Sequence, residues 1–302
     1  MRKSTAAFSV IALTALALTG CSAAPSFNGE SCERDSSPGL AAAVDVTGDL
    51  GSARVDMATP VRTESAAYAD VIVGDGTAVT TENQTSIVSL TLLNGETGET
   101  LGAPTMALLN EAEAAKTPGL EQILPCATQG SRVVYSLPTN DLGDGGAAQV
   151  GMQADENIII VADFVYVALP QAQGADVFNT KRGLPSVVRA PEGRPGIIIP
   201  DSEAPTELVT ETLIEGDGEV VGESQPMFHA TAVDWSNRSV LTTTWDGPVS
   251  VDPSGLPADV LAAVQEATIG SQVMVVVPGS GDQSAQAWVV DVLGVVPPEL
   301  TN

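Results

Sequence analysis

The most constraining feature of this sequence is an internal repeat. Three short segments of the first half recur in the second half, in the same order and at nearly constant spacing. Two of them contain matching glycine motifs, Gly74-Asp75-Gly76 with Gly216-Asp217-Gly218, and Gly130-Ser131 with Gly270-Ser271. Self-similarity of this kind indicates that one structural unit occurs twice. The three matched pairs are residues 72–79 with 214–221, 129–134 with 269–274, and 161–165 with 289–293.

The residue pattern around these motifs predicts mainly β-strands. Short runs rich in Val, Ile and Thr alternate with Gly, Asp and Asn, which is typical of strands and the turns between them. One helix-like stretch precedes each Gly-Ser pair, at residues 118–127 and 257–268, and the second has apolar residues along one face. We therefore expect the α+β class, in which each copy is an antiparallel sheet wrapped on one short helix.

Composition divides the chain into five parts. The predicted linker is rich in Pro and Gly and is expected to contain one short strand, at residues 197–199. The parts are a signal peptide (1–21), a tether (22–40), a first domain (41–170), a linker (171–205) and a second domain (206–297).

The order of these elements resembles the FKBP-type peptidyl-prolyl cis-trans isomerase domain. In that family a Gly-Asp-Gly hairpin opens the sheet, a proline-started helix leads into a Gly-Ser or Gly-Glu segment, and a strand of the Val-Val-Asp-Val-Leu type closes the domain. The second copy has this order over residues 207–296 and ends in Val289-Val290-Asp291-Val292-Leu293. The first copy has it more loosely, over residues 44–169. The resemblance implies two degenerate FKBP-like domains.

The resemblance also implies a mechanism that needs no nucleophile, metal or cofactor. Rotation about an X-Pro bond is opposed by a barrier of ~18–20 kcal/mol, which amide resonance sets. In the family, a dry aromatic pocket takes the proline ring, and a few hydrogen bonds favour the twisted amide over the planar one. Such an enzyme leaves no catalytic triad or carboxylate pair in its sequence, and we identify no certain catalytic residue here.

The residues that match the family's proline pocket in the second copy are mostly not aromatic. Aliphatic or polar residues stand at most of the expected aromatic positions, and only Trp288 keeps a ring. Loss of the ring walls removes apolar contact with proline, so we expect isomerase activity to be weak or lost. The pocket candidates are Leu241, Thr242, Val251, Leu256, Val260 and Trp288.

The N-terminus has the pattern of a bacterial lipoprotein signal. A positive stretch, Arg2-Lys3, precedes an apolar run that is shorter than the ~20 residues a spanning helix needs. The run ends in Leu18-Thr19-Gly20-Cys21, which looks like a lipobox, in which the chain is cut before the cysteine and the cysteine is lipidated. We therefore expect Cys21 to anchor the chain at the extracytoplasmic face of the cell membrane. An ordinary signal peptide with a chance cysteine is the alternative.

Net charge narrows the range of partners. The chain has 12 Lys and Arg against 38 Asp and Glu, a formal net charge of −26. Such a surface repels phosphate backbones, so we do not expect nucleic-acid binding. It also repels an anionic bilayer, which leaves the lipid as the only expected membrane contact.

Two cysteines remain once Cys21 is assigned to lipidation. Cys32 and Cys126 form an even pair in an oxidising location, and we expect them to form a disulfide that pins the N-terminal segment to the first domain. Two free thiols are the alternative. Two separate cysteines without a histidine cluster do not make a metal site, so no metal is predicted.

Three further features have both a structural and a functional interpretation. His229, the only histidine, is interpreted as a half-buried strand residue and not as a base, because the sequence fixes no carboxylate beside it. Residues 140–145 are interpreted as a solvated turn, because they lack EF-hand spacing and a closing glutamate. Trp235 and Trp245 are interpreted as cross-strand packing partners, with exposed anchors for a peptide as the alternative.

Two functional hypotheses follow. In the first, the chain is a membrane-anchored peptidyl-prolyl isomerase that helps proline-containing exported polypeptides to fold. In the second, it is a catalytically inactive binding module of the same fold that holds an envelope protein or peptide. The family resemblance favours the first hypothesis, and the composition of the pocket favours the second.

Overall fold

The computed structural model describes residues 26–32, 34–143, 145–178 and 181–298. The predicted signal peptide and Cys21 lie outside the described residues. Among the residues described, no helix has the length and apolar character needed to cross a membrane.

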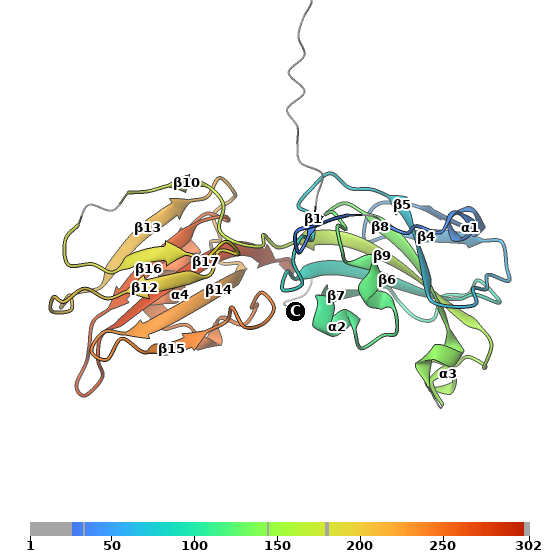
Figure 1. The fold of residues 1–302 in the computed structure, drawn as a ribbon. Helices are drawn as coiled ribbons and strands as arrows, with labels where there is room; N and C mark the ends of the chain where they lie inside the picture. Colours follow the sequence, from blue (N-terminus) through green and yellow to red (C-terminus); the bar gives the residue numbers. More distant parts are fainter. Residues whose placement is uncertain (1–25, 33, 144, 179–180, 299–302) are drawn as a thin grey trace, which may run out of the picture.

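Two antiparallel sheets make up most of the described chain, and helices are few, which confirms that part of the predicted fold class (Figure 1). In spatial order, the first sheet contains β5 (Ala67–Ile72), β8 (Arg132–Pro138), β9 (Asn157–Val167), β6 (Ser86–Asn94) and β7 (Thr105–Leu109). The second contains β10 (Ala175–Asp176), β13 (Val209–Glu215), β16 (Gln272–Val277), β17 (Gln286–Val296), β14 (Gln225–Asp234) and β15 (Val240–Thr243). Without β10, the two sheets have the same strand order.

The helices are short, and the two predicted ones differ in outcome. The stretch predicted at 257–268 contains α4 (Ala258–Glu266), whereas the one at 118–127 forms only a 3₁₀ helix, Leu120–Ile123. Gly119 has a left-handed φ of 75° directly before that turn and Pro125 follows it, so neither end can extend. The remaining helices are α1 (Pro38–Ala43), α2 (Glu111–Ala114), α3 (Gly146–Gln149) and the 3₁₀ helices Thr139–Leu142 and Pro253–Gly255.

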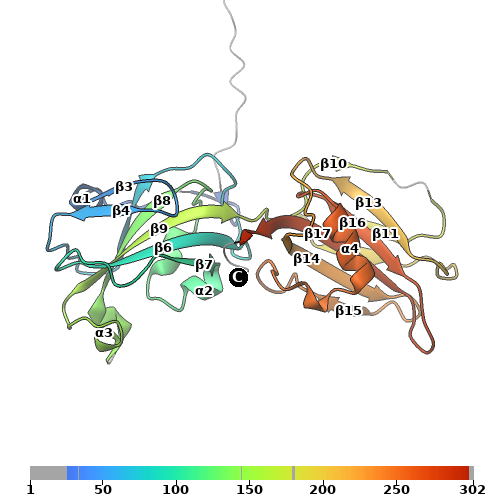
Figure 2. The same cartoon turned by 180° about the vertical axis from the view of Figure 1, so that it is seen from behind.

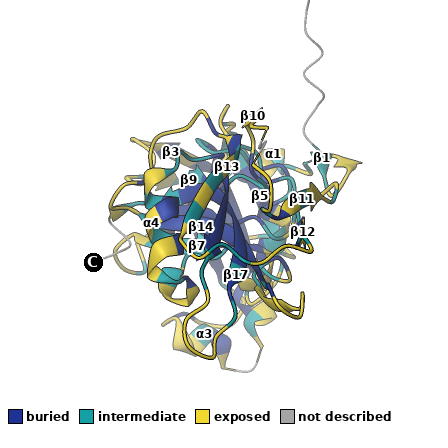
Figure 3. Ribbon diagram, turned by 90° about the vertical axis from the view of Figure 1, so that its left-hand side faces the viewer, coloured by how far each residue is buried: buried dark blue, intermediate teal, exposed yellow. Residues whose placement is uncertain are grey.

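Each sheet has a helical segment on one face, the 3₁₀ helix Leu120–Ile123 on the first sheet and α4 on the second. A two-stranded hairpin covers the other face of each sheet. In the first half, β3 (Val44–Thr47) and β4 (Arg54–Met57) form that hairpin; in the second, β11 (Ser186–Arg189) and β12 (Pro195–Ile198) form it. Apolar clusters fill both layers in both halves. Figure 3 shows the central strands buried and α4 exposed along its outer side.

Segments predicted as connections carry secondary structure of their own. The predicted tether contains the small hairpin of β1 (Ser26–Phe27) and β2 (Glu30–Ser31), followed by the start of α1. The predicted linker contains β10, β11 and β12, of which β12 overlaps the single strand expected there. Ile197 and Ile199 pack against the outer face of the second sheet. Burial of these residues explains why the segment is folded in spite of its Pro and Gly content.

The repeated glycine motifs of the first half meet each other in space. Gly74 lies so close to the backbone at Gln129 that an added Cβ would collide with the Gln129 carbonyl oxygen. Its N–H donates to Ser131 Oγ over 3.0 Å, and its carbonyl accepts from the Thr128 hydroxyl over 2.7 Å. Gly74 is therefore required for close approach of two segments, and its φ is not left-handed.

The second half repeats this contact. Gly216 N–H donates to Ser271 Oγ over 3.0 Å, and the Thr268 hydroxyl donates to the Gly216 carbonyl over 2.8 Å. A Cβ on Gly216 would collide with the Ile269 carbonyl oxygen. The repeat in the sequence thus reflects one tertiary contact that is made twice.

The two sheets meet end to end at an apolar joint, as Figures 1 and 2 show from opposite sides. Leu169 N–H donates to the Leu293 carbonyl over 2.9 Å across this joint. Gly294 lies against the Tyr166 ring, with 2.7 Å between the position of an added Cβ and the nearest ring carbon. The residues packed there include Ile87, Met106, Leu108, Tyr166, Ala168, Leu169, Met227, Val249, Val251, Leu293 and Val296.

Candidate functional site

The structure separates the six residues predicted to line a proline pocket. Leu256, Val260 and Trp288 belong to one buried core cluster beneath α4, where the Trp288 side chain is only 5% exposed. Val251 packs instead at the joint between the two sheets. Leu241 and Thr242 lie exposed on β15, which pairs only with β14 among the described strands. These six side chains therefore do not form one enclosure around a ligand.

The reason for this separation is the position of β15 at the outer edge of the sheet. Its partner β14 has a register shift between Ala232 and Val233, which changes how the edge strand aligns with the rest of the sheet.

The Trp288 indole N–H donates to Gln286 Oε1 over 2.9 Å within β17. The ring thus serves as a core residue with its polar atom satisfied.

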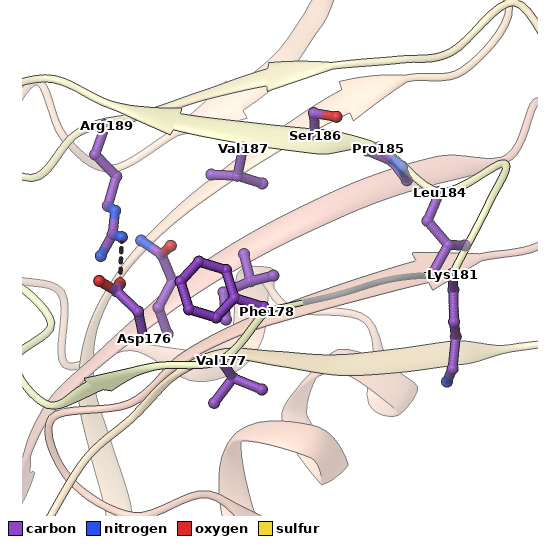
Figure 4. Close-up of a pocket in the computed structure, with 11 residues that line it drawn as sticks. Asp176, Val177, Phe178, Lys181, Leu184, Pro185, Ser186, Val187 and Arg189 are labelled. Carbon is purple, nitrogen blue, oxygen red and sulfur yellow. Dashed lines mark hydrogen bonds and ion pairs between the residues drawn. The ribbon is translucent and has the colours of Figure 1, made fainter.

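A hollow of about 360 Å³ lies on the opposite face of the second sheet, under the hairpin of β11 and β12 (Figure 4). The floor is provided by Leu213 of β13 and Gln272 of β16, and the walls by β11 and by residues on either side of 179–180, among them Phe178 and Leu184. Phe178 is 90% exposed, and Figure 4 shows its ring in the middle of the lining side chains. The lining comprises Asp176, Val177, Phe178, Lys181, Leu184, Pro185, Ser186, Val187, Arg189, Leu213 and Gln272.

Ion pairs connect the walls of this hollow. Arg189 Nη2 lies 2.7 Å from Asp176 Oδ1, and Lys181 pairs with Glu211 of β13. Arg189 and Asp176 are 38% and 62% exposed, so their pair contributes no more than about 1 kcal/mol to stability. Separating Arg189 from Asp176 to receive a ligand therefore costs little.

Our sequence interpretation missed this site because it falls in the segment predicted to be a linker. One signal in the sequence could have indicated it. Four basic residues, Lys181, Arg182, Arg189 and Arg194, are concentrated there in a chain that has only 12 in total.

A buried carboxylate lies directly behind the hollow. Asp291 of β17 is 1% exposed; Gln272 Nε2 donates to its Oδ1 over 2.7 Å, and Ala172 N–H donates to its Oδ2 over 2.9 Å. Burial raises the pKa of Asp291 to about 6, although both hydrogen bonds and the charge of Arg189 act in the opposite direction. Both groups that donate to the Asp291 carboxylate, the Gln272 amide and the Ala172 N–H, are neutral.

The first half holds the matching carboxylate differently. Asp163 of β9 pairs with fully buried Arg132 through two hydrogen bonds, Nε to Oδ1 at 2.6 Å and Nη2 to Oδ2 at 2.8 Å. The three remaining guanidinium protons are donated to the carbonyl oxygens of Thr47, Gly48 and Asp49 in the hairpin, at 3.5, 3.0 and 2.9 Å. Arg132 and Gln272 both follow a Gly-Ser motif, so the difference at this one position gives Asp163 a charged partner and Asp291 a neutral one.

Asp291→Asn is expected to remove a pH dependence from stability. Aspartate in the unfolded chain has a pKa near 3.9, so between pH 4 and pH 6 the Asp291 carboxyl is protonated more in the folded state than in the unfolded state. The free energy of unfolding therefore falls as pH rises through this range. Asparagine stays neutral and can accept from Ala172 while it donates to a flipped Gln272 amide. Relative to wild type, the variant should gain on the order of 2–3 kcal/mol between pH 4 and pH 7. Chemical denaturation at both pH values measures this difference, and an equal stability difference between variant and wild type at pH 4 and at pH 7 would contradict it.

His229 occupies a buried position opposite Asp291 in the strand register of β14 and β17. Its Nδ1 lies 3.1 Å from Thr244 Oγ1, and its ring stacks on Trp245 with 4.4 Å between centroids. Burial lowers the pKa of His229 to about 4, so the ring is neutral at pH 7. The residue lies in a strand, as expected, but its side chain is fully buried.

The tryptophans are also largely enclosed. Trp235 donates its indole N–H to the Ser202 carbonyl over 3.2 Å and packs among residues of the outer layer of the second half. Trp245 stacks on His229 instead of on Trp235. Both side chains are buried, so neither is an exposed anchor in this structure.

Cys32 and Cys126 are joined in a disulfide with 5.9 Å between their Cα atoms. Arg34, two residues further on, makes two hydrogen bonds to the Asp70 carboxylate and donates to the carbonyl oxygens of Ile123 and Pro125. The disulfide and the arginine together hold the N-terminal segment against the first half. Within the described ranges, no group of three or more His, Cys, Asp and Glu side chains is arranged to hold a metal ion.

Comparisons with known proteins give only distant likenesses. No family model matches the chain, and no curated protein matches it. The three FKBP domains of wheat FKBP73 are similar in structure at 12% identity and a TM-score of 0.33, covering 77% of this chain and 95% of that chain. The N-terminal domain of FKBP42 from Arabidopsis thaliana is similar at 14% identity and a TM-score of 0.28, covering 38% and 94%. Likeness at this level does not establish that the chain belongs to that family.

Proposed function

We propose that this chain is a lipid-anchored extracytoplasmic protein with two FKBP-like domains, and that it binds a polypeptide partner without catalysing prolyl isomerisation. The proposal is based on where the structure places the six residues predicted to line a proline pocket. Three of its residues are core residues, two are exposed on an edge strand, and one lies at the joint between the sheets. A twisted amide needs a dry, enclosed site, and this arrangement does not enclose one.

Support for two domains comes from the architecture of the halves. Each sheet has the same strand order and its own apolar layers on both faces. Support for the extracytoplasmic location comes from the lipobox-like sequence at Cys21 and from the Cys32–Cys126 disulfide, because disulfides persist in oxidising compartments. The expected partner is an envelope protein or peptide.

A prolyl isomerisation assay on residues 22–302 tests the proposal. We expect no acceleration above the uncatalysed rate for peptides that vary the residue before proline, because the six residues predicted to line a proline pocket do not enclose a common site. Trp288→Phe serves as the matched variant, since it keeps a ring in the core and removes the indole. Acceleration by the wild-type chain that falls in this variant would overturn the proposal and favour a membrane-anchored isomerase acting on exported polypeptides.

A further inference from the structure

The hollow under β11 lies in the most basic stretch of an acidic chain. Residues 176–194 contain four basic residues against two acidic ones, Asp176 and Glu192, a net charge of +2. The whole chain has a net charge of −26. Lys181 and Arg194 are paired with Glu211 and Asp246 from outside this stretch. A negatively charged ligand is therefore attracted here mainly by Arg182 and Arg189 and is repelled by most of the remaining surface.

The two hairpins that cover the sheets differ in the residues they present to solvent. On β3 and β4 the exposed positions are Asp45, Thr47, Arg54 and Asp56, which are polar or charged. On β11 and β12 the exposed positions include Val188 and Ile198, at 56% and 55% exposure. Exposed apolar residues on a surface hairpin mark an interaction surface when they are grouped with other apolar side chains. Val188 and Ile198 do not line the hollow; the apolar side chains that do line it include Phe178 and Leu184.

The hairpin also offers backbone groups for pairing. Among the described strands, β11 pairs only with β12, so its other edge has no strand partner. An extended polypeptide can add to an open edge through main-chain hydrogen bonds, while side-chain pockets select the sequence. Ser186, Val187 and Arg189 of β11 all line the hollow. An incoming segment would therefore meet backbone, apolar and charged groups together.

We propose that this hollow binds an extended segment of a partner protein in which an Asp or Glu side chain lies next to an apolar side chain. The inference rests on the proposed function as a binding module and names the chemistry of its partner. The ligand carboxylate replaces Asp176 on the Arg189 guanidinium, which can bind a carboxylate through two parallel hydrogen bonds. The apolar side chain packs on Phe178, Leu184 and Val187. The surface negative charge elsewhere disfavours binding of the same peptide outside this site.

An array of N-acetylated, C-amidated octapeptides tests the inference on residues 22–302. Matched peptides place Glu, Gln or Lys beside apolar residues at one central position; Glu and Gln have nearly the same shape and differ in charge, and Lys reverses the charge. We expect the Glu peptides to be enriched and their binding to weaken as salt is raised. Arg189→Gln and Phe178→Ser should each reduce the affinity about tenfold or more.

Matched substitutions in the first half provide the controls. Arg54→Gln removes an exposed arginine from the other hairpin, and Val73→Ser removes an apolar side chain that is 78% exposed. Both variants should bind as wild type does. Enrichment of Lys or Gln peptides, an absence of any enrichment, or Glu-peptide binding that survives Arg189→Gln and Phe178→Ser would overturn the assignment. The proposed function fails on a different result, namely acceleration of prolyl isomerisation.

Discussion

Replacing Asp163 with asparagine is expected to lower the free energy of unfolding by about 3–5 kcal/mol, because it leaves a buried arginine without its counter-ion. The Arg132 side chain is fully buried, and its two shortest hydrogen bonds go to Asp163. Asparagine can accept one of these hydrogen bonds but does not neutralise the guanidinium. The Gly51 N–H also donates to Asp163 Oδ2 over 2.7 Å, so the turn of the β3–β4 hairpin loses an anchor as well.

The matched control for this variant is Asp291→Asn, the same substitution at the corresponding strand of the second half. Its partners are the neutral Gln272 side chain and the Ala172 N–H, so at pH 7 it should keep or gain stability. Urea denaturation of both variants and wild type, followed by tryptophan fluorescence and far-ultraviolet circular dichroism, measures the contrast. Equal losses in the two variants would show that the Arg132–Asp163 pair has no special importance.

Removing the disulfide with Cys32→Ser and Cys126→Ser together is expected to cost about 4–5 kcal/mol. The bridge links residues 94 positions apart, so without it the unfolded chain gains the entropy of a long open loop. The native state would then hold the N-terminal segment mainly through Arg34 and its contacts with Asp70. We expect the segment before α1 to become sensitive to proteolysis in the double variant.

Thermal unfolding with and without reductant gives the matching measurement. Wild type in reductant should unfold as the double variant does, and the double variant should not respond to reductant. Thiol titration of unfolded wild-type residues 22–302 provides an independent check, because an intact disulfide leaves no free thiol in that chain. Two titratable thiols before reduction would contradict the pairing and favour the alternative of free cysteines.

The sequence by itself determined the architecture at the level of elements. Alternation of β-branched residues with turn residues predicted an antiparallel, mainly β chain, and the internal repeat anticipated two sheets with one strand order. The apolar face of residues 257–268 predicted α4, because helix periodicity is a local property. The same reasoning overestimated residues 118–127, where a left-handed Gly119 limits the helix to a short 3₁₀ segment.

Only the tertiary structure decided where the functional candidates lie. Family position suggested that Leu241, Thr242 and Trp288 share a pocket, but strand register places the first two on an exposed edge and the third in the core. Pro and Gly content suggested a linker, but residues of 176–198 form the wall of the hollow and the cover of the second sheet.

The difference between the surroundings of the two buried aspartates was also decided only by the tertiary structure. In sequence, Asp163 and Asp291 occupy matching positions at the last strands of the two copies. Their surroundings differ because Arg132 and Gln272 reach them from neighbouring strands. Local periodicity specifies which residues form strands and which face is apolar, since those depend on near neighbours in the chain. Contacts between distant segments depend on register and on the packing of layers, which near neighbours do not encode.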